Sequence, residues 1–258
     1  MIAVTGRAPS LPPAFRLVAL ERAGSTNDEA RRLAGEGAQD GTLVWARAQT
    51  GGRGRLGRAW DSPEGNLYCS AVLRPEIPLA RAPELGFVAA LGVGGMVGAL
   101  APPLSDIRYK WPNDVLLNDG KVAGILLESA LAPDGALDFL VLGVGVNLRS
   151  HPRETSFPAT SLMAEGAEAA EVETALESFA RHLLHWADRW LDEGFAAVRK
   201  AWLARAWRLN EALDVKLGDG DVSGRFAGLA EDGALILALA DGSSRVIAAG
   251  DVRAARAG

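Results

Sequence analysis

The stretch IRYKWPNDVLLNDGKVAGILLE, residues 107–128, does most to indicate the fold of this chain. Its apolar runs at residues 107–117 and 122–128 predict two strands, and Asn118-Asp119-Gly120 between them is typical of a hairpin turn. Because both runs are nearly continuous, we expect them in the middle of a sheet that is covered on both faces.

Further strands and helices are predicted on either side of this hairpin. Strands are expected at residues 17–21, 42–49, 66–73 and 139–147. Helices are expected at residues 25–34, with Ser25 as the N-cap, at 85–100, and at 172–190 and 195–206, where apolar residues recur at steps of three and four. Together these elements predict an α+β fold, a mixed β-sheet flanked by helices.

The texture of the sequence changes near Leu213. Short alternating runs follow at residues 215–217, 223–229, 234–239 and 245–248, and Gly-Asp turns separate them. They predict a small β meander or barrel of roughly 45 residues, too small to stand alone and therefore docked on the main domain. We expect a first domain at residues 1–210 and a small β domain at 211–258.

Composition limits the class of protein. A chain of 258 residues is long enough for one large domain, or for a large and a small one. The net charge of -5 argues against nucleic acid as the main partner, because phosphate binding needs a positive surface. Cys69 is the single cysteine, which excludes an internal disulfide and a cysteine-based zinc site and fits a cytoplasmic protein.

Neither a signal peptide nor a membrane span is expected. The first 15 residues contain Pro9, Pro12 and Pro13 and lack the apolar core of a signal peptide. Residues 85–104 are apolar, but they consist mostly of glycine and alanine and end at Pro102 and Pro103. This composition predicts a soluble helix that packs closely through its small residues.

A loop rich in glycine and arginine occupies residues 51–58. Its GxGxxG pattern is not a dinucleotide fingerprint, because another strand follows it where a helix would be needed. The guanidinium groups of Arg53, Arg55 and Arg58 suit a carboxylate or a phosphate, and the glycines allow the loop to order over such a ligand. A solvated surface loop is the alternative, and the neighbouring Trp60 could stack on a purine or belong to the core.

Polar residues also interrupt the apolar strand at residues 107–117. Pro112 cannot donate to a strand ladder, so a bend or bulge is expected there. Asn113 and Asp114 could serve a sugar, a phosphate or Mg²⁺, although a structural turn explains them equally well. Lys121, at the mouth of the next strand, could direct a positive charge into a cleft or be a solvated strand end.

Five segments, in this order, resemble the biotin–protein ligases. They are Ser25-Thr26-Asn27, QTGGRGRLGRAW at residues 49–60, KWPND at 110–114, KVAGILLE at 121–128 and Gly145-Val146-Asn147. The resemblance covers residues 17–150 and implies the class II synthetase-like catalytic domain of biotin and lipoate ligases. The C-terminal meander is similar to the small SH3-like domain of that family.

The resemblance also implies roles for individual residues. The expected biotin site comprises Ser25, Thr26, Asn27, Gln49, Arg53, Gly54, Arg55 and Lys121. The expected ATP and adenylate site comprises Arg55, Arg58, Trp60, Lys110, Asn113 and Asn147, with Asp114 as a candidate Mg²⁺ ligand. Leu56 departs from the arginine that many members carry, so the loop has one cation fewer.

The chemistry implied by the resemblance has two steps and uses ATP, biotin and Mg²⁺. Biotin's carboxylate attacks the α-phosphorus of ATP and forms biotinyl-5′-AMP and pyrophosphate, which needs no protein nucleophile. Arg53, Arg55 and Lys121 would stabilise the charge that develops on the phosphoryl group. A lysine of a biotin carboxyl carrier protein, the partner expected in acetyl-CoA carboxylase, then attacks the acyl carbon, with Asp114 assisting its deprotonation.

Two other functions remain open at this point. A lipoate or octanoate ligase or transferase shares the catalytic fold, although the arginine loop and KWPND favour biotin. Some family members repress transcription through an N-terminal DNA-binding domain, but here the first motif begins at Ser25, too early for such a domain, so no operator binding is expected. A homodimer is compatible with the family, but the residues do not determine it.

Overall fold

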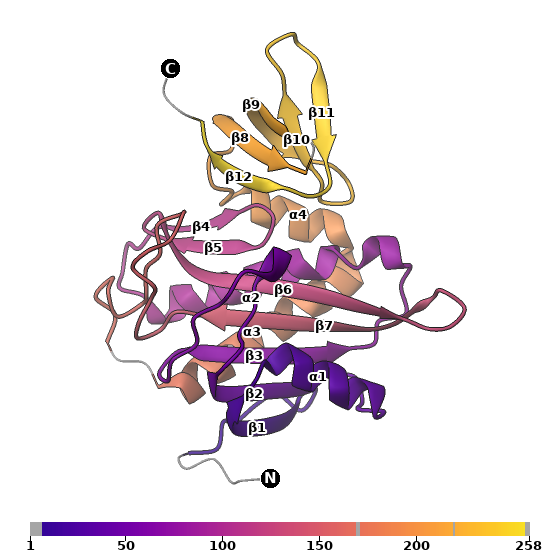
Figure 1. Cartoon of the computed structure of the whole chain (residues 1–258), viewed down its shortest axis with the longest axis vertical. Coiled ribbons are helices and arrows are strands. Elements are labelled where there is room, and N and C mark those ends of the chain that lie inside the picture. Colours follow the sequence, from indigo (N-terminus) through magenta and orange to yellow (C-terminus); the bar gives the residue numbers. More distant parts are fainter. Residues whose placement is uncertain (1–6, 169–170, 219, 256–258) are drawn as a thin grey trace.

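The larger of two β-sheets forms the centre of the molecule (Figure 1). The computed structural model describes residues 7–168, 171–218 and 220–255. Seven strands lie in the order β1-β2-β3-β7-β6-β5-β4. Their bounds are β1 Arg16–Ala23, β2 Thr42–Gln49, β3 Leu67–Leu73, β4 Ile107–Lys110, β5 Asp114–Leu117, β6 Gly120–Leu131 and β7 Leu137–Val146. The β1–β2 pair is parallel and the other pairs are antiparallel, so the predicted mixed sheet is confirmed.

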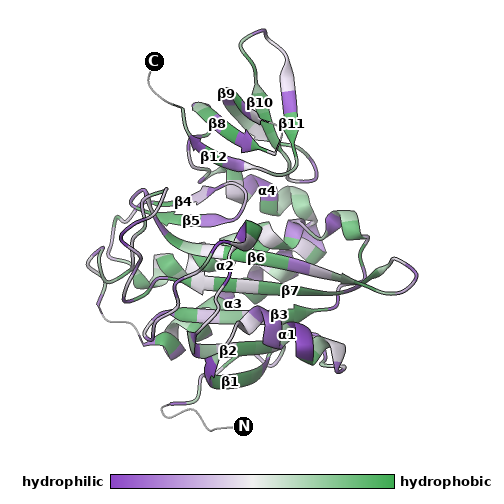
Figure 2. Cartoon of the chain, viewed as in Figure 1, coloured by the Kyte–Doolittle hydropathy of each residue, from purple (hydrophilic) through white to green (hydrophobic). Residues whose placement is uncertain are grey.

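Helices cover both faces of this sheet. Helix α1, Thr26–Gly35, lies on one face, whereas α2, Glu84–Leu100, and α3, Val172–Glu193, lie on the other (Figure 1). Helix α4, Phe195–Leu203, follows α3. Figure 2 shows the sheet strands mostly hydrophobic and α1 strongly hydrophilic outside the face that it buries. The α+β fold class predicted from the sequence is therefore confirmed.

Helix α2 is the apolar segment that could resemble a membrane span. Among the described residues, Leu79–Leu100 is long and apolar enough for one, but 67% of its most apolar window is buried in the protein. A Cβ atom on Gly92 would lie 3.1 Å from the Cα of Leu183 in α3. The small residues thus allow the close helix packing that the sequence predicted.

The prediction of one strand at residues 107–117 is wrong. These residues form two antiparallel strands, β4 and β5, and the chain reverses at a cis peptide bond between Trp111 and Pro112. The physical reason is that Pro112 has no N–H for a strand ladder, so the interruption becomes a turn rather than a bulge. As a result, β4 and β5 lie at one end of the sheet instead of in its middle, and Lys110 becomes the cross-strand partner of Asp114.

The hairpin turn predicted between residues 117 and 120 is confirmed. Asn118 and Asp119 have φ angles of 48° and 65° and connect the antiparallel strands β5 and β6. Asparagine and aspartate tolerate the left-handed conformation because their short polar side chains bond locally. This turn brings Lys121 back beside the β4–β5 pair.

A second sheet follows, in the order β11-β10-β9-β8-β12. Its strands are β8 Ala212–Leu217, β9 Gly220–Leu229, β10 Leu235–Ala238, β11 Ser244–Ile247 and β12 Asp251–Ala254. The first four were predicted, but β12 was missed because a strand of four residues with one buried apolar side chain, Val252, carries little hydrophobic pattern. Trp111 Nε1 donates to the carbonyl of Gly233 at 3.1 Å, which connects the β4–β5 turn to this sheet.

Candidate active site

The predicted site residues lie around one cavity of about 260 Å³. The start of α1, the glycine-rich loop, the β4–β5 turn, β6, β7 and the start of β12 enclose it. All of the predicted residues line it: Ser25, Thr26, Asn27, Gln49, Arg53, Gly54, Arg55, Arg58, Trp60, Lys110, Asn113, Asp114, Lys121 and Asn147. Segments more than 120 residues apart in the sequence, such as those of Ser25 and Asn147, therefore converge on one site.

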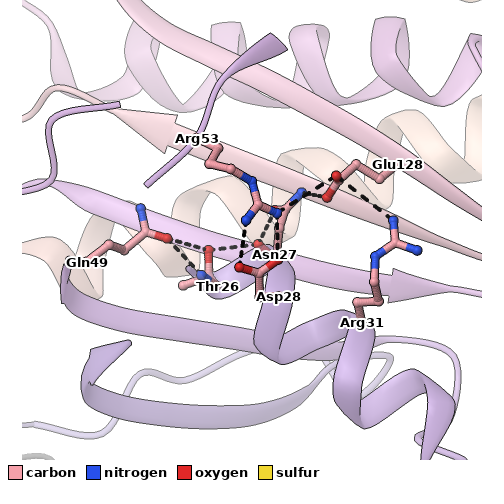
Figure 3. Close-up of polar contacts among 8 residues, drawn as sticks. Thr26, Asn27, Asp28, Arg31, Gln49, Arg53 and Glu128 are labelled. Carbon is pink, nitrogen blue, oxygen red and sulfur yellow. Dashed lines mark hydrogen bonds and ion pairs between the residues drawn. The ribbon is translucent and has the colours of Figure 1, made fainter. Parts of the chain in front are cut away.

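The first turn of α1 forms an uncharged polar end of the cavity. Gln49 Oε1 accepts a hydrogen bond from the Thr26 backbone N–H at 2.8 Å and lies 3.1 Å from Thr26 Oγ1 (Figure 3). Ser25 stands at the N-cap position with extended backbone, but its hydroxyl makes no capping bond, so that part of the prediction is wrong. The Gln49 side chain takes over because it reaches the first N–H of the helix from β2.

Asn27 is held by two residues that the sequence analysis missed. Its Nδ2 donates to Glu128 Oε2 at 2.7 Å, and its Oδ1 accepts from Ser70 Oγ at 2.6 Å. Asn27 and Ser70 are buried, and they come from α1 and β3, whereas Glu128 lies on β6. Glu128 is the last residue of the KVAGILLE motif, which was the available signal for it.

Arg53 binds a carboxylate of the protein itself. Its two terminal nitrogens lie 2.7 and 2.5 Å from the oxygens of Asp28, and Glu128 is 4.0 Å away (Figure 3). The hydrogen bond from Arg53 lowers the pKa of Asp28. This bidentate geometry is the one by which a guanidinium recognises a carboxylate ligand.

The glycine-rich loop closes on itself as a narrow hairpin. The Gly54 N–H donates to the Arg58 carbonyl at 2.7 Å, and the Trp60 N–H donates to the Gly52 carbonyl at 2.9 Å. A Cβ atom on Gly52 would lie 2.6 Å from the Trp60 carbonyl, so glycine is needed there. Leu56 occupies the tip with φ 57° and is 81% exposed.

The other two arginines connect this loop to distant elements. Arg55 donates to Asn113 Oδ1 at 3.3 Å in the β4–β5 turn, and Arg58 forms an ion pair with Asp251 at the start of β12. Burial lowers the pKa of Arg55. Sequence reasoning missed Asp251 because no local pattern relates β12 to the loop.

Asp114 lies between two lysines. Its Oδ1 is 2.6 Å from Lys121 Nζ, and its Oδ2 is 3.8 Å from Lys110 Nζ. Lys110 is buried, and its Nζ lies 4.8 Å from the ring centre of Phe157. Burial lowers the pKa of Lys110. The cavity thus contains two ammonium groups that share one carboxylate.

The donor set around Asp114 does not fit a magnesium ion held by the protein. Mg²⁺ takes oxygen ligands, whereas this carboxylate faces ammonium groups on both sides. Over the described ranges, 7–168, 171–218 and 220–255, no three His, Cys, Asp or Glu side chains cluster as metal ligands. Asp114 therefore acts here as a partner of Lys110 and Lys121.

The Trp60 indole packs against two glycines of the sheet. A Cβ atom on Gly145 of β7 would lie 2.5 Å from Trp60 Nε1, and one on Gly124 of β6 would lie 3.0 Å from the same ring. Lys121 Nζ is 5.3 Å from the ring centre. The indole is half-buried and lines the cavity, so it offers an aromatic surface beside the cationic groups.

Comparison with known protein families identifies the family of this chain. Residues 11–204 match the biotin/lipoate A/B protein ligase family, and residues 209–253 match the biotin protein ligase C-terminal domain. The chain belongs to the biotin/lipoate A/B protein ligase family. It is 42% identical to the biotin–[acetyl-CoA-carboxylase] ligase of Paracoccus denitrificans over 84% of this chain and 92% of the relative.

Further relatives agree with this family. The biotin–[acetyl-CoA-carboxylase] ligase of Mycobacterium tuberculosis is 34% identical over 92% of this chain and 88% of its own length. The structure of the Aquifex aeolicus biotin protein ligase in complex with biotin and ATP superposes with a TM-score of 0.77 at 29% identity, over 93% of this chain and 99% of that one. The family, the fold class and the ligase class of enzyme indicated by the sequence motifs are confirmed.

In this ligase, Asn147 mainly forms hydrogen bonds with backbone carbonyls of the protein itself. Its Nδ2 donates to the Thr160 carbonyl at 2.9 Å, and its backbone N–H donates to the Val122 carbonyl at 2.8 Å. Asn113 is similarly engaged, because its Nδ2 donates to the Ile125 carbonyl at 2.6 Å. Both side chains line the cavity, but their amide hydrogens hold its walls.

Proposed function

We propose that this protein activates biotin with ATP to biotinyl-5′-AMP and transfers the biotin to a lysine of a biotin carboxyl carrier protein. One observation carries the proposal: a single cavity joins an uncharged hydrogen-bonding end, at Thr26 and Gln49, to a cationic end at Lys121. The uncharged end suits the ureido ring of biotin, and the cationic end suits its carboxylate beside the phosphates of ATP.

The first step is an in-line displacement at the α-phosphorus of ATP. A carboxylate oxygen of biotin forms the new P–O bond, and the bond to the departing pyrophosphate breaks. Lys121, Arg53 and Arg55 stabilise the charge on the phosphoryl oxygens, and Asp114 orients Lys121 through their 2.6 Å ion pair. The loop at residues 51–58 covers the mixed anhydride and keeps water from it.

The second step forms an amide. The amine of the carrier lysine attacks the acyl carbon, the bond to AMP breaks, and the amine loses a proton, which Asp114 helps to remove. We propose that Mg²⁺, where the reaction uses it, enters with the phosphates of ATP, since the donors around Asp114 do not form a protein-held site.

The remaining assignments extend this proposal. Biotin contacts are proposed for Ser25, Thr26, Asn27, Gln49, Arg53, Gly54, Arg55 and Lys121, and nucleotide contacts for Arg55, Arg58, Trp60, Lys110, Asn113 and Asn147. The proposed division into a catalytic domain at 1–210 and a β domain at 211–258 follows the two sheets. We further propose that the protein acts in the cytoplasm without binding operator DNA.

The deciding experiment measures pyrophosphate release from ATP with biotin, lipoate or octanoate as the acid. We expect release with biotin and not with the other two, followed by labelling of a purified carrier domain. Release with lipoate or octanoate alone would overturn the proposal in favour of the alternative in the same family. The named relatives support biotin, because both are called biotin–[acetyl-CoA-carboxylase] ligases.

A further inference from the structure

We infer that Glu128 is a positioning residue that fixes the direction of the hydrogen bonds offered to the ring of biotin. The inference rests on the proposed function and adds a residue to it. Glu128 Oε2 accepts from Asn27 Nδ2 at 2.7 Å, and Asn27 lines the cavity (Figure 3). Glu128 itself does not line the cavity, so it acts through a neighbour. That neighbour is Asn27, which it hydrogen-bonds, and not Arg53, which lies 4.0 Å away and is held by Asp28.

The carboxylate selects one of the two orientations of the Asn27 amide. An ionised carboxylate only accepts hydrogen bonds, so it requires the NH₂ group of Asn27 on its side. The amide oxygen then lies toward Ser70 Oγ, 2.6 Å away. In the flipped amide, two oxygens would face each other at the Glu128 side, which is unfavourable in a buried site.

Burial and close packing restrict the Asn27 amide to its two flip orientations. Asn27 is 5% exposed and Ser70 is fully buried. A Cβ atom on Gly143 would lie 2.0 Å from Asn27 Oδ1, so the amide rests directly on the backbone of β7. Ser70 and Gly143 are cross-strand partners, which places the hydroxyl and this gap side by side. The amide can flip in place but cannot move elsewhere.

The orientation of the Asn27 amide also affects the neighbouring hydroxyl groups at the polar end of the cavity. Ser70 Oγ also lies 2.8 Å from Thr26 Oγ1, which in turn contacts Gln49 Oε1 at 3.1 Å. Ser70 has one hydroxyl hydrogen, so it can donate to Asn27 Oδ1 or to Thr26 Oγ1, but not to both. With the Asn27 oxygen on the Ser70 side, Ser70 donates to Asn27 and can accept from Thr26 Oγ1; in the flipped amide, Ser70 would donate to Thr26, whose hydroxyl would donate to Gln49 Oε1. The charge on Glu128 therefore sets which of these hydroxyl bonds form.

This arrangement of donors and acceptors suits the carbonyl of a cyclic urea such as the ring of biotin. An amide nitrogen carries two hydrogens, and Glu128 accepts one of those on Asn27. In the part of the chain that the structure describes, no second acceptor contacts Asn27 Nδ2, so its other hydrogen is left for a ligand carbonyl. A ligand without a ring carbonyl, such as ATP, gains nothing from this arrangement.

The first test compares Glu128→Gln with wild type. A glutamine keeps the shape but accepts either amide orientation, so the Kd and KM for biotin should rise about tenfold, the loss expected for one hydrogen bond involving a charged group. The KM for ATP and kcat should stay within about twofold. The matched control is Arg31→Ala, which removes the exposed guanidinium 4.0 Å from Glu128 and should leave biotin binding unchanged.

The second test is a double-mutant cycle that separates polarity from folding. In Asn27→Asp two carboxylates oppose each other, whereas Asn27→Asp combined with Glu128→Gln restores a donor facing an acceptor. The double variant should bind biotin about tenfold more tightly than Asn27→Asp alone, as measured by calorimetry without ATP. Additive effects would overturn the inference.

The outcomes also separate this inference from the proposed function. If the wild-type protein neither binds biotin nor releases pyrophosphate with it, the function itself is wrong. If wild type is active and Glu128→Gln binds biotin as tightly, only the positioning role is wrong. Equal weakening of biotin and ATP would likewise contradict it, because a merely structural role would affect both ligands.

Discussion

Arg58 in the glycine-rich loop and Asp251, the first residue of β12, form an ion pair although they are 193 residues apart in the sequence. Burial by itself raises the pKa of Asp251, but Arg58 and neighbouring cations outweigh it and the pKa is lowered overall. The pair is therefore formed above the ordinary pKa of an aspartate, and it is lost only as the pH falls through the lower folded value. Through this pair, the small β domain helps to hold the loop over the cavity.

Replacing Asp251 tests this connection. In Asp251→Ala the loop loses its anchor, so the KM for ATP should rise about tenfold. Stability should fall by less than about 1 kcal/mol, because the Arg58 side chain is half exposed and the pair is screened by solvent. Steady-state kinetics and urea unfolding measure both quantities. The control is Glu211→Ala, which breaks a comparable exposed pair with Arg208 away from the cavity; an equal KM change there would contradict the anchoring role.

Lys121 should be needed for adenylate formation. Lys121→Met should lower the rate of biotin-dependent pyrophosphate release by about a hundredfold or more, because a positioned cation stabilises the transferring phosphoryl group. Lys121→Arg should not restore the rate, since a planar guanidinium cannot occupy the same point between Asp114 and Trp60. Single-turnover measurement of pyrophosphate tests this, and full activity of the arginine variant would contradict it.

The glycines under Trp60 are expected to be essential for nucleotide binding. A Cβ atom in Gly145→Ala would lie 2.5 Å from the indole nitrogen, so the ring must shift. We expect ATP binding to weaken about tenfold and the free energy of unfolding to fall by about 1–3 kcal/mol. Gly86→Ala is the control, because nothing lies within 4 Å of its added Cβ in α2; it should keep ATP affinity. Unchanged affinity in Gly145→Ala would exclude the indole as a nucleotide contact.

Buried Lys110 should make the free energy of unfolding increase with pH. Because burial lowers its pKa below the ordinary 10.5, the folded state binds fewer protons than the unfolded state in that interval. Wild-type stability should therefore rise with pH up to about 10.5, relative to Lys110→Met, by at most about 1.4 kcal/mol per pH unit. Urea unfolding of both proteins between neutral and alkaline pH measures this difference, and parallel curves would show that Lys110 does not contribute.

Asp114 can be tested separately in the two steps. Asp114→Asn should slow transfer from pre-formed biotinyl-5′-AMP to a carrier lysine, because the variant cannot accept the proton of the amine. It should also slow adenylate formation, since Lys121 loses its 2.6 Å partner. Mixing purified adenylate and carrier with the variant isolates the second step. An unchanged transfer rate would limit Asp114 to positioning Lys121.

Local features of the fold could be predicted from the sequence. The Asn118-Asp119-Gly120 turn, helix α2 and strand β2 follow from turn residues and apolar runs, which act within a few neighbours. The motifs also identified fourteen of the residues that line the cavity, because each chemical group is a property of the residue itself. The sequence by itself thus determined the family and many of the chemical groups of the site, but not Asp251.

Only the tertiary structure decided how these groups are paired. Strand β12 carries little pattern, yet its position beside β8 brings Asp251 to Arg58. Likewise, Glu128 and Asn27 meet only because α1 packs on the sheet that contains β6. Hydrogen bonds and ion pairs between distant segments depend on strand order and register, which are fixed by the packing of the whole core and not by any local run of residues.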